Sequence, residues 1–253
     1  MNDGNPGAAS GRIDNRSYYD VMAGDYERER HHGYHLFLDE SEVAAVAGLV
    51  RGRDVLEVGC GTGLILQRLA CLARTARGVD LSEGMLAKAR ARGLDVVQGD
   101  ATRLPFPDAS FDVAVSFKVL AHVQDIRAAV AEMARVLRPG GYVAVEFYNR
   151  RSIRSLIKAF KRPHPIGGGV DDTAVYTRYD TIREAVSYLP EGLTVDRIVG
   201  IRTIVPFAAI MRVPVVGRVL GWKDRLVGRT PLGRLGGFVV VIARKAPCSR
   251  APR

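Results

Sequence analysis

Alternating strand-like and helix-like segments predict an α/β protein, built on a doubly wound, mostly parallel sheet with helices on both faces. Two further observations support this fold class. The 253 residues are 47% hydrophobic, which is enough for the core of one such domain. A glycine-rich turn, VLEVGCGTG over Val55–Gly63, joins an apolar strand to a helix, and ligands bind at this edge of open parallel sheets.

Short apolar runs predict five strands in the first 148 residues. They are 54–58, 76–80, 94–98, 111–116 and 142–148. Apolar residues at helical spacing predict helices over 39–50, 64–72, 83–91 and 126–137. Ser82 is the expected N-cap of the third helix, because its oxygen can accept hydrogen bonds from unpaired backbone N–H groups. Pro139-Gly140-Gly141 is the expected stop of the fourth.

The pattern changes after Asn149. A basic helix is expected over 152–161. Thr181 and Glu184 predict a capping box, which opens a helix that ends at Leu189.

The two ends of the chain differ in character. Alternation predicts strands over 193–205 and 238–244, separated by an apolar and basic insertion, 206–237.

Residues 1–17 are polar and rich in small side chains, which predicts a disordered tail ahead of a single domain over 18–253.

The net charge of +10 is placed unevenly. Residues 149–253 hold 20 Lys and Arg against 7 Asp and Glu, which predicts an acidic partner or surface for this half. Cys60, Cys71 and Cys248 show no metal-ligand spacing and cannot all pair, so a reducing, cytoplasmic setting is expected. No apolar run reaches the length that spans a bilayer.

The turn after the first strand predicts a nucleotide-type cofactor site. Its glycines alternate, at Gly59, Gly61 and Gly63. Glycine lets a ligand lie against bare backbone, and Glu57 just before the turn can reach hydroxyls or an ammonium group. The dinucleotide fingerprint G-x-G-x-x-G/A is the rival, but Leu64 stands at its sixth position. Asp80, 21 residues after Gly59, fits a ribose diol in either interpretation, so the glycines alone leave a nicotinamide cofactor open.

Four more motifs follow this turn in order. They are GVDLSEGML, VVQGDATRLPFPDASFDVAVSF, AHV and MARVLRPGGYVAVEFYN. With them the chain resembles the class I S-adenosylmethionine-dependent methyltransferases of the ubiquinone/menaquinone-biosynthesis kind (methyltransferase type 11). The resemblance covers roughly Tyr18 to Asn149. It implies a Rossmann-like seven-stranded sheet with an antiparallel last strand, and S-adenosylmethionine as the cofactor, with S-adenosylhomocysteine as product.

The resemblance also implies roles for individual residues. Asp80 would accept hydrogen bonds from the ribose hydroxyls, and Asp100 one from the adenine amino group, although Asp100 also suits a turn. The other expected cofactor contacts are Glu57, Gly59, Gly61 and Gly63 around the methionine part, Leu81, Met85 and Ala101 around the adenine, Ser116 and Phe117 near the ammonium group, and Tyr18 and Tyr26 of a covering segment over 18–38.

His122, in AHV, is the first candidate for a general base that faces the methyl acceptor, with Tyr148 and Asp125 as weaker ones. A histidine that binds nearby backbone is the alternative. His31, His35 and Asp39 share a helix face at metal-ligand spacing, but no second ligand cluster is visible, and no metal is expected.

The basic second half leaves the partner open. The insertion 206–237 is the expected lid over the acceptor. It suits a large apolar acceptor, an anionic membrane, an acidic carrier protein, or simply a solvated basic face. Nucleic acid is disfavoured, because only Trp222 and Phe207 could stack on bases there. We therefore expect methyl transfer to a small apolar or anionic metabolite. RNA methylation and cofactor binding without transfer are the alternatives.

Overall fold

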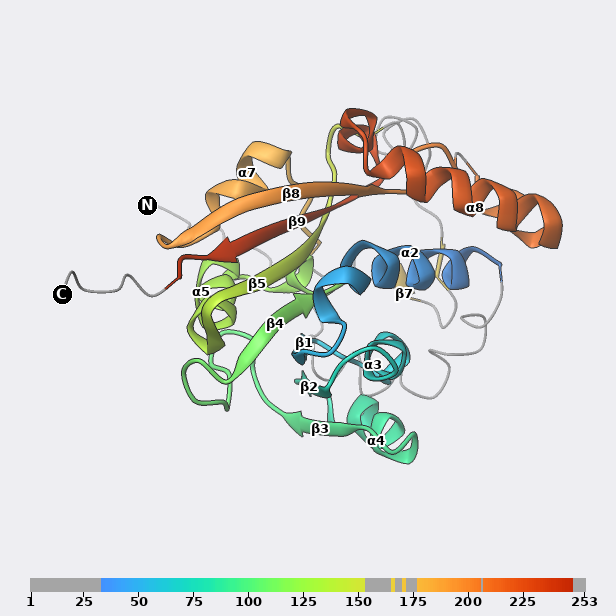
Figure 1. Cartoon of the computed structure of the whole chain (residues 1–253). Helices are drawn as coiled ribbons and strands as arrows, with labels where there is room; N and C mark the ends of the chain where they lie inside the picture. Colours follow the sequence, from blue (N-terminus) through green and yellow to red (C-terminus); the bar gives the residue numbers. More distant parts are fainter. Residues whose placement is uncertain (1–32, 153–164, 167–169, 172–176, 206, 248–253) are drawn as a thin grey trace, which may run out of the picture.

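The computed structural model of the chain describes residues 33–152, 165–166, 170–171, 177–205 and 207–247 (Figure 1). The expectations for Tyr18, Tyr26 and the tail lie outside the described residues, as does the basic helix expected over 152–161, apart from Ser152.

A mixed seven-stranded sheet forms the centre of the molecule, in the order β3-β2-β1-β4-β5-β9-β8. Its strands are β1 (Asp54–Val58), β2 (Thr75–Asp80), β3 (Asp95–Gln98), β4 (Phe111–Ser116), β5 (Leu137–Tyr148), β8 (Leu193–Ile201) and β9 (Phe238–Lys245). The pairs from β3 to β5 are parallel, whereas β9 is antiparallel to both of its neighbours. The predicted sheet, with its antiparallel last strand, is confirmed. A separate two-stranded sheet pairs β6 (Pro165–Ile166) with β7 (Val170–Asp171).

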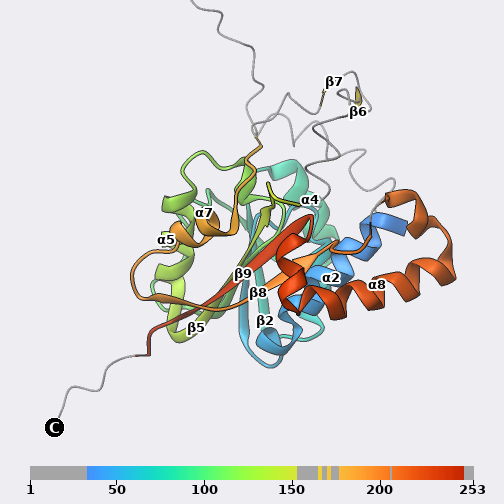
Figure 2. The same ribbon diagram turned by 90° about the horizontal axis from the view of Figure 1, so that it is seen from above.

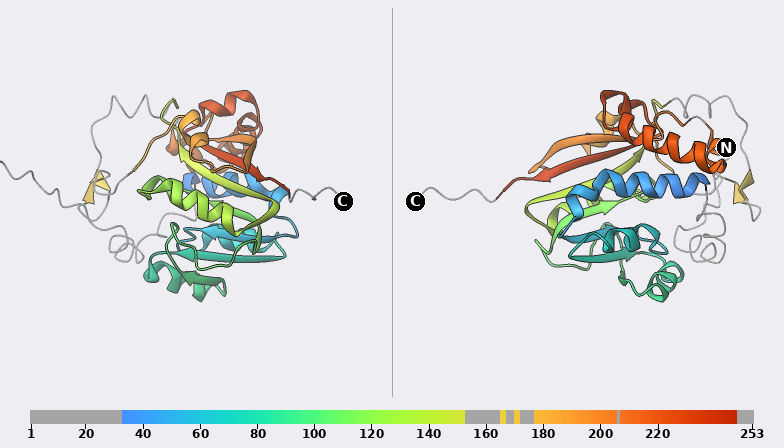
Figure 3. Two further views of the ribbon diagram at one scale, coloured as in Figure 1. Left: turned by 90° about the vertical axis from the view of Figure 1, so that its left-hand side faces the viewer. Right: turned by 45° about the vertical axis from the view of Figure 1, so that its right-hand side comes forward.

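Helices cover both faces of the sheet (Figures 1 and 3). They are α2 (Gly33–Val50), α3 (Leu64–Ala70), α4 (Glu83–Ala91), α5 (Ile126–Val136), α7 (Ile182–Ser187) and α8 (Pro214–Gly228), with 3-10 turns η1 (Leu120–His122), η2 (Ala208–Arg212) and η3 (Pro231–Leu235). Buried side chains of α5 and α7 pack on one face, and those of α2 and α3 on the other. The apolar side of α4 packs beside α3, against β3. Both faces of the sheet are buried, which explains why the strand sequences are nearly continuous apolar runs.

Local capping signals are confirmed where the sequence places them. The hydroxyl of Ser82 accepts a hydrogen bond from the N–H of Met85 at 3.2 Å, at the start of α4. Thr181 and Glu184 form the predicted capping box of α7. Each bond joins residues three apart, so it depends little on the rest of the fold.

Several boundaries differ from those predicted. Helix α2 already includes Gly33, where the described residues begin, whereas a start at Asp39 was expected, and α7 ends at Ser187 instead of Leu189. Strand β5 begins at Leu137, so the Pro-Gly-Gly expected only to stop a helix lies inside a strand, next to a register shift in the β4 ladder.

Strand β8 ends at Ile201 instead of Val205. Arg202 adopts a positive φ of 59°, and the buried carboxylate of Asp224 accepts hydrogen bonds from the N–H groups of Arg202 (2.9 Å) and Ile204 (2.7 Å). These bonds take the place of the ladder bonds and turn the chain away from the sheet.

The insertion 206–237 contains secondary structure that the sequence analysis did not assign. Helix α8 occupies its centre, with η2 before it and η3 after it. Figures 2 and 3 show α8 running beside α2 at the edge of the molecule.

Replacing Asp224 by Ala should destabilise the fold. The change removes the acceptor for two backbone N–H groups and leaves them unsatisfied, which costs about 1–3 kcal/mol of unfolding free energy. Urea denaturation measures this loss. Asp196→Ala is the control, because Asp196 pairs with Arg197 at the surface and should change stability by less than about 0.5 kcal/mol. Equal effects of the two changes would contradict the role given to Asp224.

Candidate functional site

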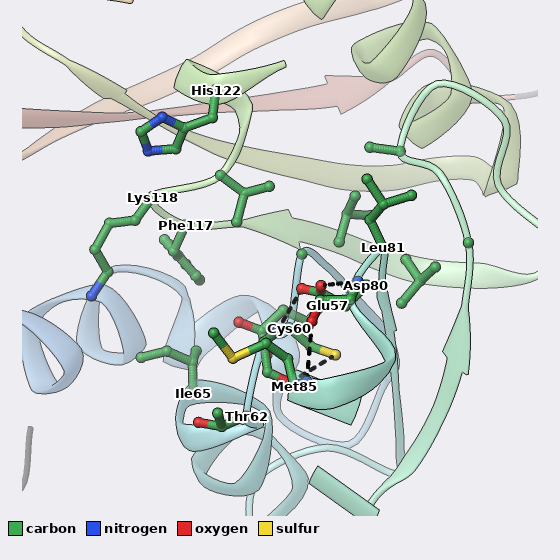
Figure 4. Close-up of a pocket in the computed structure, with 18 of the residues that line it drawn as sticks. Glu57, Cys60, Thr62, Ile65, Asp80, Leu81, Met85, Phe117, Lys118 and His122 are labelled. Carbon is green, nitrogen blue, oxygen red and sulfur yellow. Dashed lines mark hydrogen bonds between the residues drawn. The ribbon is translucent and has the colours of Figure 1, made fainter. Parts of the chain in front are cut away.

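A cavity opens at the carboxyl ends of β1, β2 and β4 (Figure 4). The glycine turn, the start of α4, the Gly99–Ala101 segment and the segment from Phe117 to Val123 line it. The space, together with the solvent at its open mouth, measures about 1070 Å³. Its place at this edge of a parallel sheet is where nucleotide-type ligands bind.

The glycine turn presents bare backbone to this cavity at Gly61. Its φ is 53°, and no atom lies within 4 Å of the place where a Cβ would stand. Its N–H donates to Oδ2 of Asp80 at 2.8 Å, which ties the turn to the end of β2. Gly59 also has a positive φ, but a Cβ there would collide with the side chain of Val119. Gly61 is therefore the position of the turn where a ligand can approach the backbone most closely.

Gly63 has a packing role that the sequence analysis did not assign. It does not line the cavity; it is the N-cap of α3, and a Cβ on it would lie 2.3 Å from Cδ1 of Leu94. Ser116 is also outside the lining, since its buried hydroxyl donates to the carbonyl of Val58 at 2.8 Å and joins β4 to β1. Contact of either residue with a cofactor stays a prediction.

Asp80 lies at the centre of the cavity wall, at the end of β2. Its Oδ2 accepts from Gly61, and its Oδ1 accepts from the N–H of Ser82 at 3.0 Å. A carboxylate oxygen has a second lone pair, so each can also accept from a ligand hydroxyl. Leu81, 40% exposed, and the buried Met85 add apolar surface beside it.

Asp100, Ala101 and Phe117 line the cavity, and their contact with a cofactor stays a prediction. Oδ1 of Asp100 accepts from both the N–H and the hydroxyl of Thr102 at 2.8 Å. The turn role and the cavity position that the sequence left as alternatives therefore occur together.

Four buried carboxyl groups lie behind the glycine turn. They belong to Asp39, Glu42, Glu57 and Glu146. Burial, followed by the negative charge of Glu42, raises the pKa of Glu57 well above 4.5. Glu57 lines the cavity, and its Oε2 has no hydrogen-bond partner among the described residues. A buried acceptor without a partner is costly, and a donor on a ligand would relieve it.

Lys118 compensates part of this negative charge and was missed by the sequence analysis. Its Nζ lies 3.0 Å from Oδ1 of Asp39 and 2.9 Å from Oε1 of Glu42, while the residue also lines the cavity. Figure 4 shows its side chain extending toward α2. The available signal was one charge inside the apolar run VAVSFKVL. Asp39 is thus paired with Lys118, while His31 of the metal face considered above lies outside the described residues. The described residues hold no group of three or more potential metal ligands.

His122 lines the cavity from the short turn η1. Figure 4 shows it across the cavity from Met85 and Thr62. Its Nδ1 lies 3.4 Å from the hydroxyl of Thr177, and its ring packs edge-on against Tyr148. Asp125 is instead the N-cap of α5, where it accepts from the N–H of Ala128. The base role of His122 stays a prediction, and so does the lid, because no described residue of the insertion lines this cavity.

Comparison with known proteins agrees with this geometry. Residues 56–145 match the methyltransferase domain family. The predicted resemblance is confirmed over that segment. A probable S-adenosylmethionine-dependent methyltransferase of Mycolicibacterium smegmatis is 46% identical over 101 residues, 39% of each chain. A demethylmenaquinone methyltransferase of Mycobacterium sp. (strain JLS) is 40% identical over 121 residues, 47% of this chain and 52% of the relative. The matches thus span about half of these curated relatives or less.

Solved structures confirm the fold over most of the chain. A methyltransferase of Thermotoga maritima, described as a possible histamine N-methyltransferase, has a TM-score of 0.65 at 26% identity and covers 90% of this chain and 99% of its own. The [4+2]-cyclase SpnF has a TM-score of 0.64 at 23% identity and covers 92% of this chain and 96% of its own. One fold thus carries different reactions, so the fold alone does not determine the reaction.

Replacing Glu146 by Gln should change how stability depends on pH. Burial, followed by the charge of Glu42, raises the pKa of Glu146 well above 4.5. The folded state then holds a proton that the unfolded chain releases, so the unfolding free energy falls as the pH rises from 4.5. Glu146→Gln should reduce this fall, as urea unfolding at a series of pH values measures.

Glu132→Gln is the control for this prediction. Arg135 lowers the pKa of Glu132, so the ionised Glu132 stabilises the folded state above pH 4.5. This stabilisation is lost as the pH falls. This variant should be less stable at neutral pH, with the fall above pH 4.5 unchanged. An unaltered slope in Glu146→Gln would show that Glu146 is ionised in the folded protein.

Proposed function

We propose that the chain binds S-adenosylmethionine in this cavity and transfers its methyl group to a small, apolar or anionic metabolite. The observation that carries this proposal is the convergence of three features: the open backbone of Gly61, the carboxylate of Asp80, and the unpartnered oxygen of Glu57. In one cavity, Gly61 lets a ligand lie against the backbone, Asp80 can accept hydrogen bonds from hydroxyls, and Glu57 can accept one from a cationic group.

The lining residues fit the parts of this cofactor. Asp80 would accept from the ribose hydroxyls, with Leu81 and Met85 against the adenine and Asp100 near its amino group. The ammonium group would face Glu57, whose buried Oε2 has no donor within the described part of the chain. The acceptor oxygens of Asp80 and Glu57, which both line the cavity, would orient the ligand before reaction.

The bound cofactor would supply the electrophilic methyl group and a good leaving group. The chain's own task is then to position the acceptor in line and to exclude water. Phe117 and Val119 would shield the reacting centre, and His122 across the cavity would take a proton from a hydroxyl acceptor.

The acceptor class and the setting complete the proposal. Relatives with the name demethylmenaquinone methyltransferase support a small-molecule acceptor. The thiols of Cys60 and Cys71 are both free, in keeping with the cytoplasm. No helix within the described residues has the length and apolar composition needed to cross a membrane.

Gly61→Ala should fold but lose cofactor affinity. Gly61 lines the cavity, and the added methyl group would stand in open space. We expect S-adenosylhomocysteine to bind about tenfold more weakly or worse in calorimetry, because overfilling a packed site costs about 1–3 kcal/mol. Gly52→Ala is matched, since Gly52 also has positive φ and open space around its Cβ position but lies outside the cavity lining. Both variants carry about 1–2 kcal/mol of backbone strain, so equal affinities would refute the proposed site.

His122→Gln should separate transfer from binding. We expect unchanged S-adenosylhomocysteine affinity and a turnover lower by about 10²–10⁴-fold if the acceptor is a hydroxyl. Turnover is followed by mass spectrometry of lysate metabolites that gain one CH₂ unit when cofactor is added. His35→Gln, on α2 and outside the cavity lining, is the control. Cofactor binding without turnover in the unmodified chain would favour a binding protein, and methylated RNA would favour the nucleic-acid alternative.

A further inference from the structure

Exposed apolar side chains gather in one part of the molecule. Eleven large apolar side chains are exposed among the described residues, and ten of them lie between Ile204 and Leu235. Scattered single residues of this kind need no explanation, but a concentration in one insertion marks an interaction surface.

Helix α8 is turned with its small residues inward. A Cβ on Gly221 would lie 3.1 Å from Cδ2 of Phe37, and one on Gly228 would lie 2.1 Å from the carbonyl oxygen of Gly200. The buried Asp224 shares this face, where it holds the 202–205 turn. Close backbone packing fills most of this inner side, and Leu220 packs against the core beside it.

Those side chains form a stripe on the outer side of α8. The stripe consists of Val215, Val219, Trp222 and Leu226, with exposures of 70%, 47%, 57% and 47%. Their spacing of four, three and four residues places them along one side of a helix. An ordinary surface helix buries such a stripe against the core, so this one is reversed.

Basic residues border the stripe. At 100° per residue, Arg218, Arg225 and Arg229 fall on one side of it and Lys223 on the other. Asp224 is the single acidic residue of α8, and it is fully buried. Arg225 pairs with Glu40 at 3.4 Å, whereas Arg218 and Lys223 are exposed. The exposed face therefore combines an apolar stripe, a tryptophan and an excess of positive charge.

We propose that α8 docks this chain on the surface of an anionic lipid bilayer. The helix would lie flat, with the stripe at the boundary of the acyl chains and its Arg and Lys residues among the phosphates. Charge favours this occupant over a second copy of the chain, which would bring like charges together. The proposal concerns a face outside the cavity and does not depend on the proposed methyl transfer.

Trp222 is the single tryptophan of the chain, so its fluorescence reports on this surface alone. The full chain is mixed with phosphatidylcholine vesicles, with or without phosphatidylglycerol. We expect a blue shift of emission and quenching by brominated acyl chains with the anionic vesicles, and weaker binding as salt is added. No shift with anionic vesicles would overturn the proposal, as would a blue-shifted, concentration-dependent emission before lipid is added, which would indicate a protein partner.

Two variants separate the apolar and electrostatic parts. Val219→Ser should weaken vesicle binding while keeping the reporter. Arg218→Glu should weaken vesicle binding by at least roughly twentyfold. The change removes one positive charge and adds one negative charge, and each unit of charge near such a surface changes the affinity about fivefold. Arg183→Glu is matched in charge and lies on α7, which packs on the opposite face of the sheet. If Arg183→Glu weakened binding equally, net charge and not α8 would be responsible. S-adenosylhomocysteine affinity, measured in parallel, tests the proposed function separately.

Discussion

The hydrogen bond from Gly61 to Asp80 is the contact on which the candidate site depends. It joins the turn after β1 to the end of β2, so the two strand ends hold each other in register across the cavity wall. Ser82 donates to the other carboxylate oxygen and also caps α4, which fixes that helix to the same carboxylate. A short, bare turn, a strand end and a helix start thus form one rigid edge. An edge that is already rigid can orient a ligand without a further loss of conformational entropy on binding.

A second constraint lies behind that edge, where carboxyl groups are buried together. Lys118 offsets the charges of Asp39 and Glu42, and it links β4 to the helix that covers the sheet. Glu57 and Glu146 remain in a setting that favours their protonated forms. Within this cluster an acceptor oxygen of Glu57 lies beside the place proposed for a cationic ligand, so the packing of α2 bears on the cavity.

The insertion is attached to the rest of the fold by contacts of its own. Asp224 and the inward glycines of α8 attach the helix closely to α2 and to the end of β8, while its apolar residues face outward. The cavity and the exposed stripe are therefore built from different segments of the chain. The acidic first half contributes the cavity, and the basic second half contributes the surface, which gives the uneven charge of the sequence a structural meaning.

Local patterns by themselves determined much of this protein: the order of strands and helices, the glycine turn, and the caps at Ser82 and Thr181. Such signals act over three or four residues, so they can be read without the fold. The tertiary structure decided the rest. Lys118 meets Asp39 across 79 residues, Gly63 proves to be a packing residue, and the stripe of α8 points away from the core. Helical spacing shows that a helix has an apolar side, but only the packed molecule decides which side is buried.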